Sequence, residues 1–395
     1  MKKFTCGLLI MGLLVTAFTG CNSKTEEKKE DTSTSNATEA GENVADEFDG
    51  VYTIGALGPL TGEAASYGNS VKNGAAIAVK EINAAGGIKV GDKSYEVVLE
   101  FQDDEATADK AVTAYNLLMD KNADAILGAV TSGASLAVTD MAYEDGILML
   151  TPSGSAQDIT KNDNVFRVCF TDPLQGELLA NYAFETAGVT KVAIIYNNSD
   201  EYSTGIKETF EAVFKDLGGT IVAAEAFAEG AVDYSTQLTK IKNTEAELIF
   251  VPAYYQNAAY ITQQAQEAGM ELPFIGSDGW DGVVAQVTDT AVIEGAVFLS
   301  PFLPTDPAAA SFVAAYEAAH NTTPDQFAAD GYDGVYIIKA AVEQAGSIEK
   351  ADVIAAMTEI EVEGVTGNMK FDENGEPDKD AKFVIIKDGK YELNK

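Results

Sequence analysis

The feature that most constrains this chain is a regular alternation of strand-like and helix-like stretches. Residues 51–57 are rich in β-branched and apolar side chains, and helical periodicity over residues 71–83 follows and ends at Gly86 and Gly87. The alternation continues with strand-like residues 95–101, 125–130 and 147–150 and with helix-like residues 106–121 and 135–144. Strands and helices that alternate in this way predict a parallel sheet covered by helices.

The alternation restarts after residues 170–173, which predicts a second α/β unit of similar plan. Its strand-like residues are 191–196, 220–226, 248–251, 273–276 and 296–299, and its helix-like residues are 206–217, 236–243 and 258–268. The tail adds helix-like residues 308–319, 334–344 and 350–359. After these, the pairs Asn374-Gly375 and Asp388-Gly389 lie next to strand-like runs and predict hairpin turns.

The N-terminus indicates the compartment. Lys2 and Lys3 precede an apolar run over residues 8–18, which is shorter than the roughly 20 residues that span a bilayer. We therefore predict a cleaved signal over residues 1–20. Because Cys21 follows small residues, the pattern is similar to a bacterial lipoprotein signal and predicts lipidation of Cys21, although an ordinary secretory signal with a chance cysteine is the alternative. Residues 21–48 are then the lipidated cysteine and a polar, disordered tether.

Charge and cysteine content exclude several classes of function and structure. A formal net charge of −36 repels phosphate backbones, so nucleic acid is not expected as a partner. Cys6 would leave with the signal and Cys21 would carry lipid, which leaves Cys169 alone. No intramolecular disulfide is therefore expected in the mature chain, and Cys169, in a strand-like run, is expected to be a buried structural thiol.

Polar residues follow several predicted strands, at the edge where open α/β sheets bind ligands. Ser132 opens a helix, so it and nearby N–H groups either hold an anion such as a carboxylate or simply cap the helix. The small hydroxyl residues of Thr151-Pro-Ser-Gly-Ser155 follow a neighbouring strand. Asp278 follows a strand of the second unit. Its carboxylate either faces the anion site, which is the arrangement of charges that a zwitterion needs, or belongs to an ordinary turn residue.

Several aromatic residues also fall in such loops and are typical of a pocket lining, although each alone would more often be a packing residue. They are Tyr67, Tyr202, Tyr254, Tyr255, Trp280, Phe327 and Tyr332.

Signals for catalysis are weak. Gly133-Ala-Ser135-Leu-Ala137 is a loose match to a nucleophile elbow, but a hydrolase triad needs a histidine, and His320, the single histidine, lies at an expected surface helix end. The sequence carries no phosphate-binding loop, zinc-protease motif, paired-cysteine motif or convincing dinucleotide fingerprint. We therefore expect a protein that is not an enzyme and that holds no cofactor and no metal.

The same residues carry a family resemblance. Gly58-Pro-Leu-Thr-Gly-Glu-Ala-Ala-Ser-Tyr-Gly68 and Glu81-Ile-Asn-Ala-Ala-Gly-Gly-Ile88 resemble the opening of the branched-chain amino-acid-binding proteins, which are type I periplasmic binding proteins serving ABC importers. Weaker similarities follow at Gly146-Ile-Leu-Met-Leu-Thr-Pro-Ser, Gly276-Ser-Asp-Gly-Trp280 and Gly331-Tyr-Asp-Gly, so that the resemblance extends over nearly everything from Val51 on.

The resemblance implies an α/β fold of two Rossmann-like lobes with parallel sheets, joined by three hinge crossovers, with the ligand between the lobes. Lobe one is then residues 49–172 plus 302–364, and lobe two is residues 173–301 plus 365–395.

The resemblance also implies roles for individual residues. Ser132 would hold the ligand α-carboxylate, and Asp278 would pair with its ammonium. The loop of Ser153, Gly154 and Ser155 would contact both groups through its backbone and the Ser155 hydroxyl. The side-chain pocket would be lined by Tyr67, Tyr202, Tyr254 and Phe327.

Two departures from the family are visible. The disulfide that some relatives have in the first lobe is absent, since this region carries Asp104 and Thr131 instead. Gly154-Ser155 stands where Ala-Thr is common, which leaves the leucine-type specificity open.

The implied function is a monomeric extracytoplasmic lipoprotein on the outer face of the cell membrane. It would capture an amino acid, with the branched-chain type favoured, and deliver it to an ABC permease by hinge closure. The alternatives are a surface sensor that presents another small solute, such as an amide or a purine-like compound, or a secreted hydrolase using Ser135 and His320.

Overall fold

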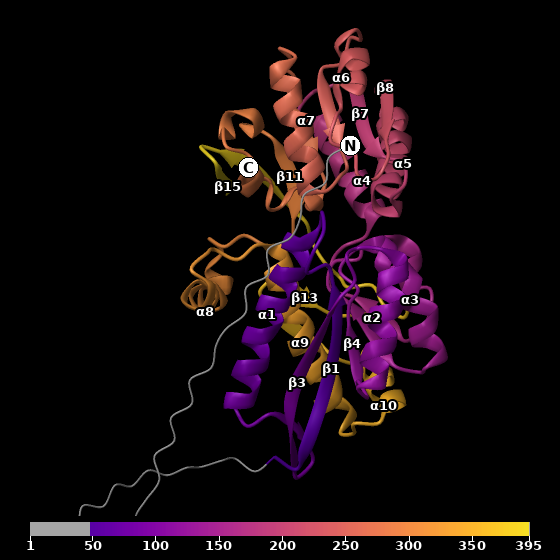
Figure 1. The fold of residues 1–395 in the computed structure, drawn as a ribbon, viewed down its shortest axis with the longest axis vertical. Helices are drawn as coiled ribbons and strands as arrows, with labels where there is room; N and C mark the ends of the chain where they lie inside the picture. Colours follow the sequence, from indigo (N-terminus) through magenta and orange to yellow (C-terminus); the bar gives the residue numbers. More distant parts are fainter. Residues whose placement is uncertain (1–47, 395) are drawn as a thin grey trace, which may run out of the picture. The chain divides into compact units, whose positions relative to one another are not determined.

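The computed structural model describes residues 48–394 and contains two large sheets. The first sheet has the order β2-β3-β1-β4-β5-β6 and is parallel except for β2, which pairs antiparallel with β3 (Figure 1). Its strands are β1 (Gly50–Gly58), β2 (Ile88–Val90), β3 (Lys93–Asp103), β4 (Ala125–Leu127), β5 (Leu148–Thr151) and β6 (Val165–Arg167). A sheet of this kind needs helices on both faces, because both faces are apolar.

Helices from distant parts of the chain supply this cover. They are α1 (Ala65–Ala84), α2 (Ala108–Asp120), α3 (Ser132–Glu144), α9 (Gln326–Ala345) and α10 (Lys350–Ala356). Side chains of α1, α9 and α10 share one apolar core with the sheet, and those of α2 and α3 share another. We call this sheet with its five helices the first lobe.

The second sheet has the order β15-β14-β11-β10-β9-β7-β8. Its strands are β7 (Lys191–Asn197), β8 (Thr220–Phe227), β9 (Leu248–Val251), β10 (Phe274–Gly276), β11 (Val297–Ser300), β14 (Lys382–Lys387) and β15 (Lys390–Leu393). Its helices are α4 (Asp172–Asn181), α5 (Glu201–Asp216), α6 (Ser235–Lys242) and α7 (Tyr255–Glu267). Apolar side chains of α4 and α5 form one core with the sheet and those of α6 and α7 another, which completes the second lobe.

Shorter elements connect these parts. They are η1 (Gln157–Thr160), η2 (Tyr182–Thr186), η3 (Asp278–Trp280), η4 (Val283–Gln286), η5 (Thr290–Ile293), η6 (Pro307–Ala309), α8 (Ala310–His320), β12 (Val362–Gly364) and β13 (Gly367–Met369). No helix within residues 48–394 is both long enough and apolar enough to cross a membrane.

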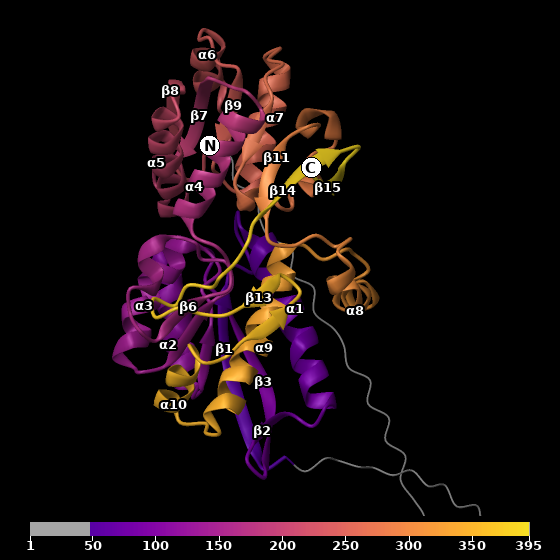
Figure 2. The same cartoon turned by 180° about the vertical axis from the view of Figure 1, so that it is seen from behind.

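The chain passes between the lobes three times. It leaves β6 for α4, returns from β11 toward α9, and leaves β13 for β14, the last path being drawn in yellow in Figure 2. The expected α/β fold of two lobes with largely parallel sheets is therefore confirmed. Residues 365–395, which the sequence assigns to lobe two as a block, are divided. Met369 and Phe371 lie in the core of the first lobe, whereas β14 and β15 belong to the second sheet.

Glycines set the distance between α1 and α9, the two helices that carry site residues at their starts. A Cβ atom on Gly74 would lie 1.8 Å from the Ala328 carbonyl oxygen, and one on Gly331 would lie 2.4 Å from the Val71 carbonyl oxygen. Because backbone atoms occupy both positions, the helices reach this spacing only with glycine there. The close crossing brings Tyr67 on α1 next to Phe327 on α9, with ring centroids 4.0 Å apart.

Candidate ligand-binding site

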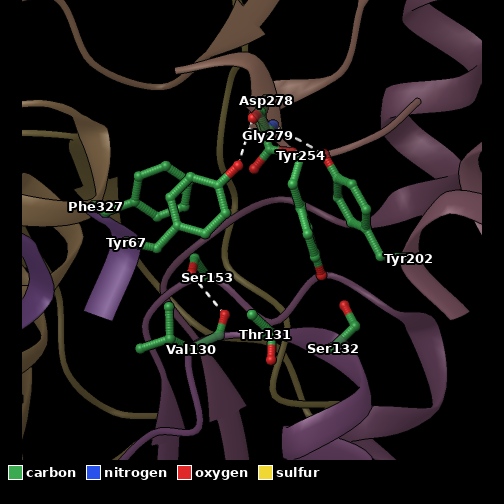
Figure 3. Close-up of a pocket in the computed structure, with 10 residues that line it drawn as sticks. All are labelled: Tyr67, Val130, Thr131, Ser132, Ser153, Tyr202, Tyr254, Asp278, Gly279 and Phe327. Atoms are coloured by element: carbon green, nitrogen blue, oxygen red, sulfur yellow. Dashed lines mark hydrogen bonds between the residues drawn. The ribbon is translucent and has the colours of Figure 1, made fainter. Parts of the chain in front are cut away.

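Residues of both lobes meet at a small cavity (Figure 3). The lining residues are Tyr67, Val130, Thr131, Ser132, Ser153, Tyr202, Tyr254, Asp278, Gly279 and Phe327. All of the residues that we predicted to contact a ligand are therefore brought together here, except Gly154 and Ser155. The cavity volume is about 10 Å³, which is about the room that one water needs. An amino acid can enter only if these side chains move apart.

Asp278 provides one charged end of the cavity. It directly follows β10 and Ser277, and it is 4% exposed. Its Oδ1 accepts a hydrogen bond from the Tyr202 hydroxyl at 2.6 Å, while no hydrogen bond joins its Oδ2 to another described residue. Burial raises the pKa of Asp278 to about 6, against the opposing effect of the Tyr202 hydrogen bond. The carboxylate is therefore ionised at neutral pH with one oxygen available to a cation.

Ser132 lies at the start of α3 and has a hydroxyl that can only donate to a ligand. Its Oγ accepts hydrogen bonds from the backbone N–H groups of Ser155 at 3.2 Å and of Ala156 at 3.1 Å. Because a hydroxyl has two acceptor sites and one proton, only the proton remains. The first N–H groups of α3 also have no partners within the helix and carry its positive dipole end. This end of the cavity is suited to an anion such as a carboxylate.

Ser153 has the opposite hydrogen-bonding state. Its hydroxyl donates to the Val130 carbonyl at 2.7 Å, the bond marked at the lower left of Figure 3. Its remaining capacity is therefore to accept, and it matches an ammonium group better than a carboxylate.

Aromatic rings form the walls between these polar groups. Tyr202 stacks on Tyr254 with centroids 5.0 Å apart, and Tyr67 contacts Tyr254 edge-on at 5.5 Å. The Tyr67 hydroxyl donates to the Gly279 carbonyl (Figure 3) and accepts from the Tyr255 N–H at 3.1 Å. Burial raises the pKa of Tyr67, Tyr202 and Tyr254 well above the ordinary value, so all three phenols stay neutral. Such walls suit an uncharged side chain.

Gly154 and Ser155 have their backbone groups engaged within the protein. The Gly154 N–H donates to Thr151 Oγ1 at 2.8 Å, and the Ser155 N–H donates to Ser132 Oγ. The Ser155 side chain is fully buried, and its Oγ has no hydrogen-bond partner within normal distance among the described residues. Their contribution in this structure is to orient Ser132 rather than to line the cavity.

Sequence reasoning missed three lining residues, Val130, Thr131 and Gly279. All three adjoin predicted site residues, and strand-end position was an available signal for them. Gly279 is required because a Cβ there would lie 2.8 Å from the Tyr202 hydroxyl. Gln175 and Gln326, which bind the backbone of Asp278 at 3.0 and 2.7 Å, carry no signal in the sequence because they come from remote helices.

Arg167 was also missed, and it supports the loop behind Ser132. Its guanidinium is fully buried, donates to the Gly154 carbonyl at 2.9 Å and pairs with Glu376 at 2.8 Å. Glu376 belongs to the third connection between the lobes. One side chain thus joins the loop of the site to that connection.

A wider, acidic cavity of about 600 Å³ adjoins the site and shares Thr131 and Tyr254 with it. Its walls include five carboxylates and no lysine or arginine; the acids are Glu63, Glu105, Asp200, Glu201 and Glu229. An acidic cavity beside the site disfavours anionic solutes.

The hydrolase alternative has no structural support. The Ser135 hydroxyl is fully buried and donates to the Ala129 carbonyl at 3.0 Å. His320 ends α8 and packs against Tyr316, on a different element from Ser135. The predicted lipidation residue Cys21 lies outside the described residues. Cys169 is a buried free thiol, as the sequence indicates.

Comparison with known proteins places this geometry in a family. The family model described as periplasmic binding protein matches residues 51–390. The Leu/Ile/Val-binding protein BraC3 of Rhizobium johnstonii is 33% identical over 328 residues, which cover 82% of this chain and 88% of the relative. A leucine-, isoleucine-, valine-, threonine-, and alanine-binding protein of Pseudomonas aeruginosa is 26% identical and covers 82% of this chain and 86% of the relative.

Solved structures agree with the sequence relatives. The branched-chain amino acid transporter substrate binding protein LivJ of Streptococcus pneumoniae, in complex with isoleucine, has a TM-score of 0.81 at 32% identity, covering 87% of this chain and 99% of that chain. The leucine binding protein LivK of Thermotoga maritima also has a TM-score of 0.81, at 28% identity, covering 87% and 98%. The family resemblance is confirmed: the chain belongs to the periplasmic binding protein family, whose members bind solutes and are not enzymes.

Proposed function

We propose that this protein is an extracytoplasmic lipoprotein that captures an amino acid, of the branched-chain type, and delivers it to an ABC permease by hinge closure. The observation that carries the proposal is the polarity of the cavity. The Asp278 carboxylate lies at one end, the Ser132 hydroxyl and the start of α3 lie at the other, and neutral aromatic rings lie between them.

A zwitterion matches this arrangement group by group. The ammonium would take the unused Oδ2 of Asp278 and the acceptor capacity of Ser153, and the carboxylate would accept from Ser132. Charge-assisted hydrogen bonds of this kind are short and strong in a site that excludes water. The relatives named for leucine, isoleucine and valine favour an apolar side chain, as do the neutral walls, and the acidic cavity beside the site disfavours an anionic one.

The contacts between the lobes support hinge closure. Tyr67 of the first lobe is bonded to Gly279 and Tyr255 of the second, and Gln326 at the start of α9 is bonded to Asp278 and Asp281. Because little free volume remains among these residues, the lobes must separate to admit a ligand and then re-form similar contacts around it. The three connections are the places where the backbone would bend. The expected lobe boundaries, with residues 365 to about 380 reassigned to lobe one, would then define the moving bodies.

The membrane attachment and the permease are parts of the same proposal. The signal-like N-terminus and Cys21 support a lipid anchor on the outer face of the membrane. Replacing Cys21 with Ala should release the protein from the membrane fraction into the medium. A variant that stays in the membrane fraction would contradict the anchor, while leaving ligand binding untouched.

Calorimetric titration with leucine and two truncated analogues tests whether the two ends of the cavity bind the ammonium and the carboxylate of the ligand. Isoamylamine lacks the carboxylate and 4-methylpentanoate lacks the ammonium, whereas both keep the apolar side chain. We expect leucine to bind and each analogue to bind at least about 30-fold more weakly. Isoamylamine leaves the Ser132 hydroxyl and the start of α3 without a partner, and 4-methylpentanoate leaves the buried Asp278 carboxylate without a counter-charge. An analogue that binds as tightly as leucine would exclude the proposed role of the group it lacks.

A further inference from the structure

A second cavity of about 410 Å³ lies between the lobes beside the ligand site. This volume is within the range of small-molecule sites. Its wall includes Ser66 and Ser70 of α1 and Asp325 at the start of α9, all in the first lobe. The second lobe contributes Asp281, three residues after Asp278, together with parts of β11, β14 and β15. The cavity therefore borders the contact between lobes without sharing a lining residue with the first cavity.

Two carboxyl groups from different lobes lie in this wall, that of Asp281 buried and that of Asp325 half-buried. Asp281 is 4% exposed, and its Oδ2 accepts from the Gln326 N–H at 2.9 Å. Its Oδ1 has no hydrogen-bond partner among the described residues. Asp325 accepts from the Ser70 hydroxyl at 2.6 Å and, as the cap of α9, from the Ala328 N–H at 2.9 Å.

The negative charge of this pair is not balanced within the described part of the chain. No lysine or arginine lines the cavity, and neither carboxyl group takes part in a salt bridge between described residues. The positive end of the α9 helix dipole offsets about half an elementary charge of the two carboxylates. Burial and the charge of Asp325 raise the pKa of Asp281 to about 8, and burial raises that of Asp325. A buried carboxylate without a counter-charge, next to a second carboxylate, is costly, so a positive charge from solution would stabilise this arrangement.

The rest of the wall indicates what kind of cation fits. Phe298, Phe302 and Tyr316 supply aromatic surface, and Leu303 and Val384 supply aliphatic surface. Aromatic faces attract ammonium groups. Within residues 48–394 no group of three or more His, Cys, Asp or Glu side chains is arranged to hold a metal ion. The combination of acidic pair and apolar wall suits an organic cation better than a metal.

We propose that this cavity binds a small organic ammonium ion, with its nitrogen between Asp281 and Asp325 and its apolar part against Phe298 and Phe302. Because the two carboxylates belong to different lobes, the bound cation would stabilise the contact between them. The site would thereby act as a second, effector site beside the amino-acid site.

Thermal unfolding of the purified protein with n-butylammonium chloride tests the proposal. At pH 8.5 we expect the Tm of the wild type to rise with the logarithm of the amine concentration, as mass action requires of a ligand of the folded state. Sodium chloride at equal ionic strength and the neutral isostere n-butanol should produce no such rise. Saturation-transfer NMR should show the butyl protons in contact with the protein.

Three variants separate this site from the amino-acid site. Asp281→Asn and Asp325→Asn keep the size and the acceptor oxygen of each side chain, and Asn caps a helix about as well as Asp. Both should lose the amine response, whereas Asp278→Asn should lose amino-acid binding and keep the amine response. That last result also keeps the proposal independent of whether the first cavity binds an amino acid.

Several outcomes would overturn the proposal. One is no amine-dependent shift in the wild type, and another is an equal shift in Asp281→Asn, which would place the amine elsewhere. A third is a gain in Tm on lowering the pH from 9 to 6 with no response to the amine at any pH. In that case a proton taken up by Asp281 or Asp325, beside Asp278 and the neutral hydroxyls of Tyr391 and Tyr316, would be sufficient to stabilise the pair.

Discussion

At the residue scale, the hydrogen bonds that Ser132, Ser153 and Asp278 already make within the protein distinguish their roles. The Ser132 hydroxyl has both acceptor sites occupied, Ser153 has its proton committed to Val130, and Asp278 has one free oxygen. Each group is therefore left with one kind of interaction to offer. If the proposed ligand binds here, these groups would fix the orientation of its ammonium and carboxylate groups independently of its side chain.

Replacing Asp278 with Asn should weaken amino-acid binding by about 30- to 1,000-fold, because the buried ammonium would lose its counter-charge. Calorimetric titration measures the change. Asp216→Asn, at an exposed position at the end of α5, is the matched control and should bind as the wild type does. Unchanged affinity in Asp278→Asn would mean that the ammonium lies elsewhere.

The raised pKa of Asp278 predicts how binding depends on pH. Above about pH 7 the carboxylate is ionised and affinity should be constant, whereas below the pKa of about 6 it should fall by about tenfold per pH unit. In the same window the ligand-free folded protein binds more protons than the unfolded chain, so the Asp278 contribution to stability declines as pH rises from about 4 to about 6. Titrations from pH 5 to 8 measure the affinity, and Asp278→Asn should show no such dependence.

At the element scale, the site depends on how closely α1 and α9 cross. Gly74→Ala should lower the free energy of unfolding by about 1–3 kcal/mol, because the new Cβ would overlap the Ala328 carbonyl. This would occur although Ala is the better helix former. At exposed position 76 on the same helix, the reverse change Ala76→Gly should cost about 1 kcal/mol from propensity alone. Denaturant titration distinguishes the two, and a stabilised Gly74→Ala would contradict the close packing.

Arg167 links two elements, the loop after β5 and the third connection between the lobes. Arg167→Lys keeps the charge but cannot bond Gly154, Thr160 and Glu376 together, since lysine lacks the planar fork. We expect weaker amino-acid binding together with a lower Tm, because Ser132 is held through this loop. Glu376→Gln should lower Tm with a smaller effect on affinity. Equal amino-acid affinity in Arg167→Lys and the wild type would show that the loop is positioned without the hydrogen bonds of the Arg167 guanidinium.

Helix and strand prediction succeeded where periodicity was strong and failed where packing decided. The strands at residues 191–196 and 248–251 are near-continuous apolar runs, and the structure has them as β7 and β9. The start of α9 was missed because Gly331 and Gly334 weaken its helical signal, whereas its packing on α1 requires glycine at Gly331. α4 was missed for a related reason, since Gly176 interrupts its pattern but is needed against the backbone of α5.

At the scale of the whole molecule, the sequence predicted two lobes because the alternation of strands and helices restarts. It could not place the segment between β13 and β14, because the contacts of Met369 and Phe371 with the first core are made over long distances in the chain. The same limit applied to the site. Residues at strand ends could be named in advance, whereas Arg167, Gln175 and Gln326 could be found only once distant elements were brought together.

Thermal unfolding of the protein against the twenty amino acids is the most direct test of the central claim. A ligand of the folded state stabilises it by about 2.7 kcal/mol at a hundredfold excess over Kd. We predict that leucine, isoleucine and valine raise the Tm together and that aspartate and glutamate do not, given the acidic cavity beside the site and the Asp278 carboxylate. No shift with any amino acid would contradict the claim and would indicate a solute without the zwitterion that this cavity is built to hold.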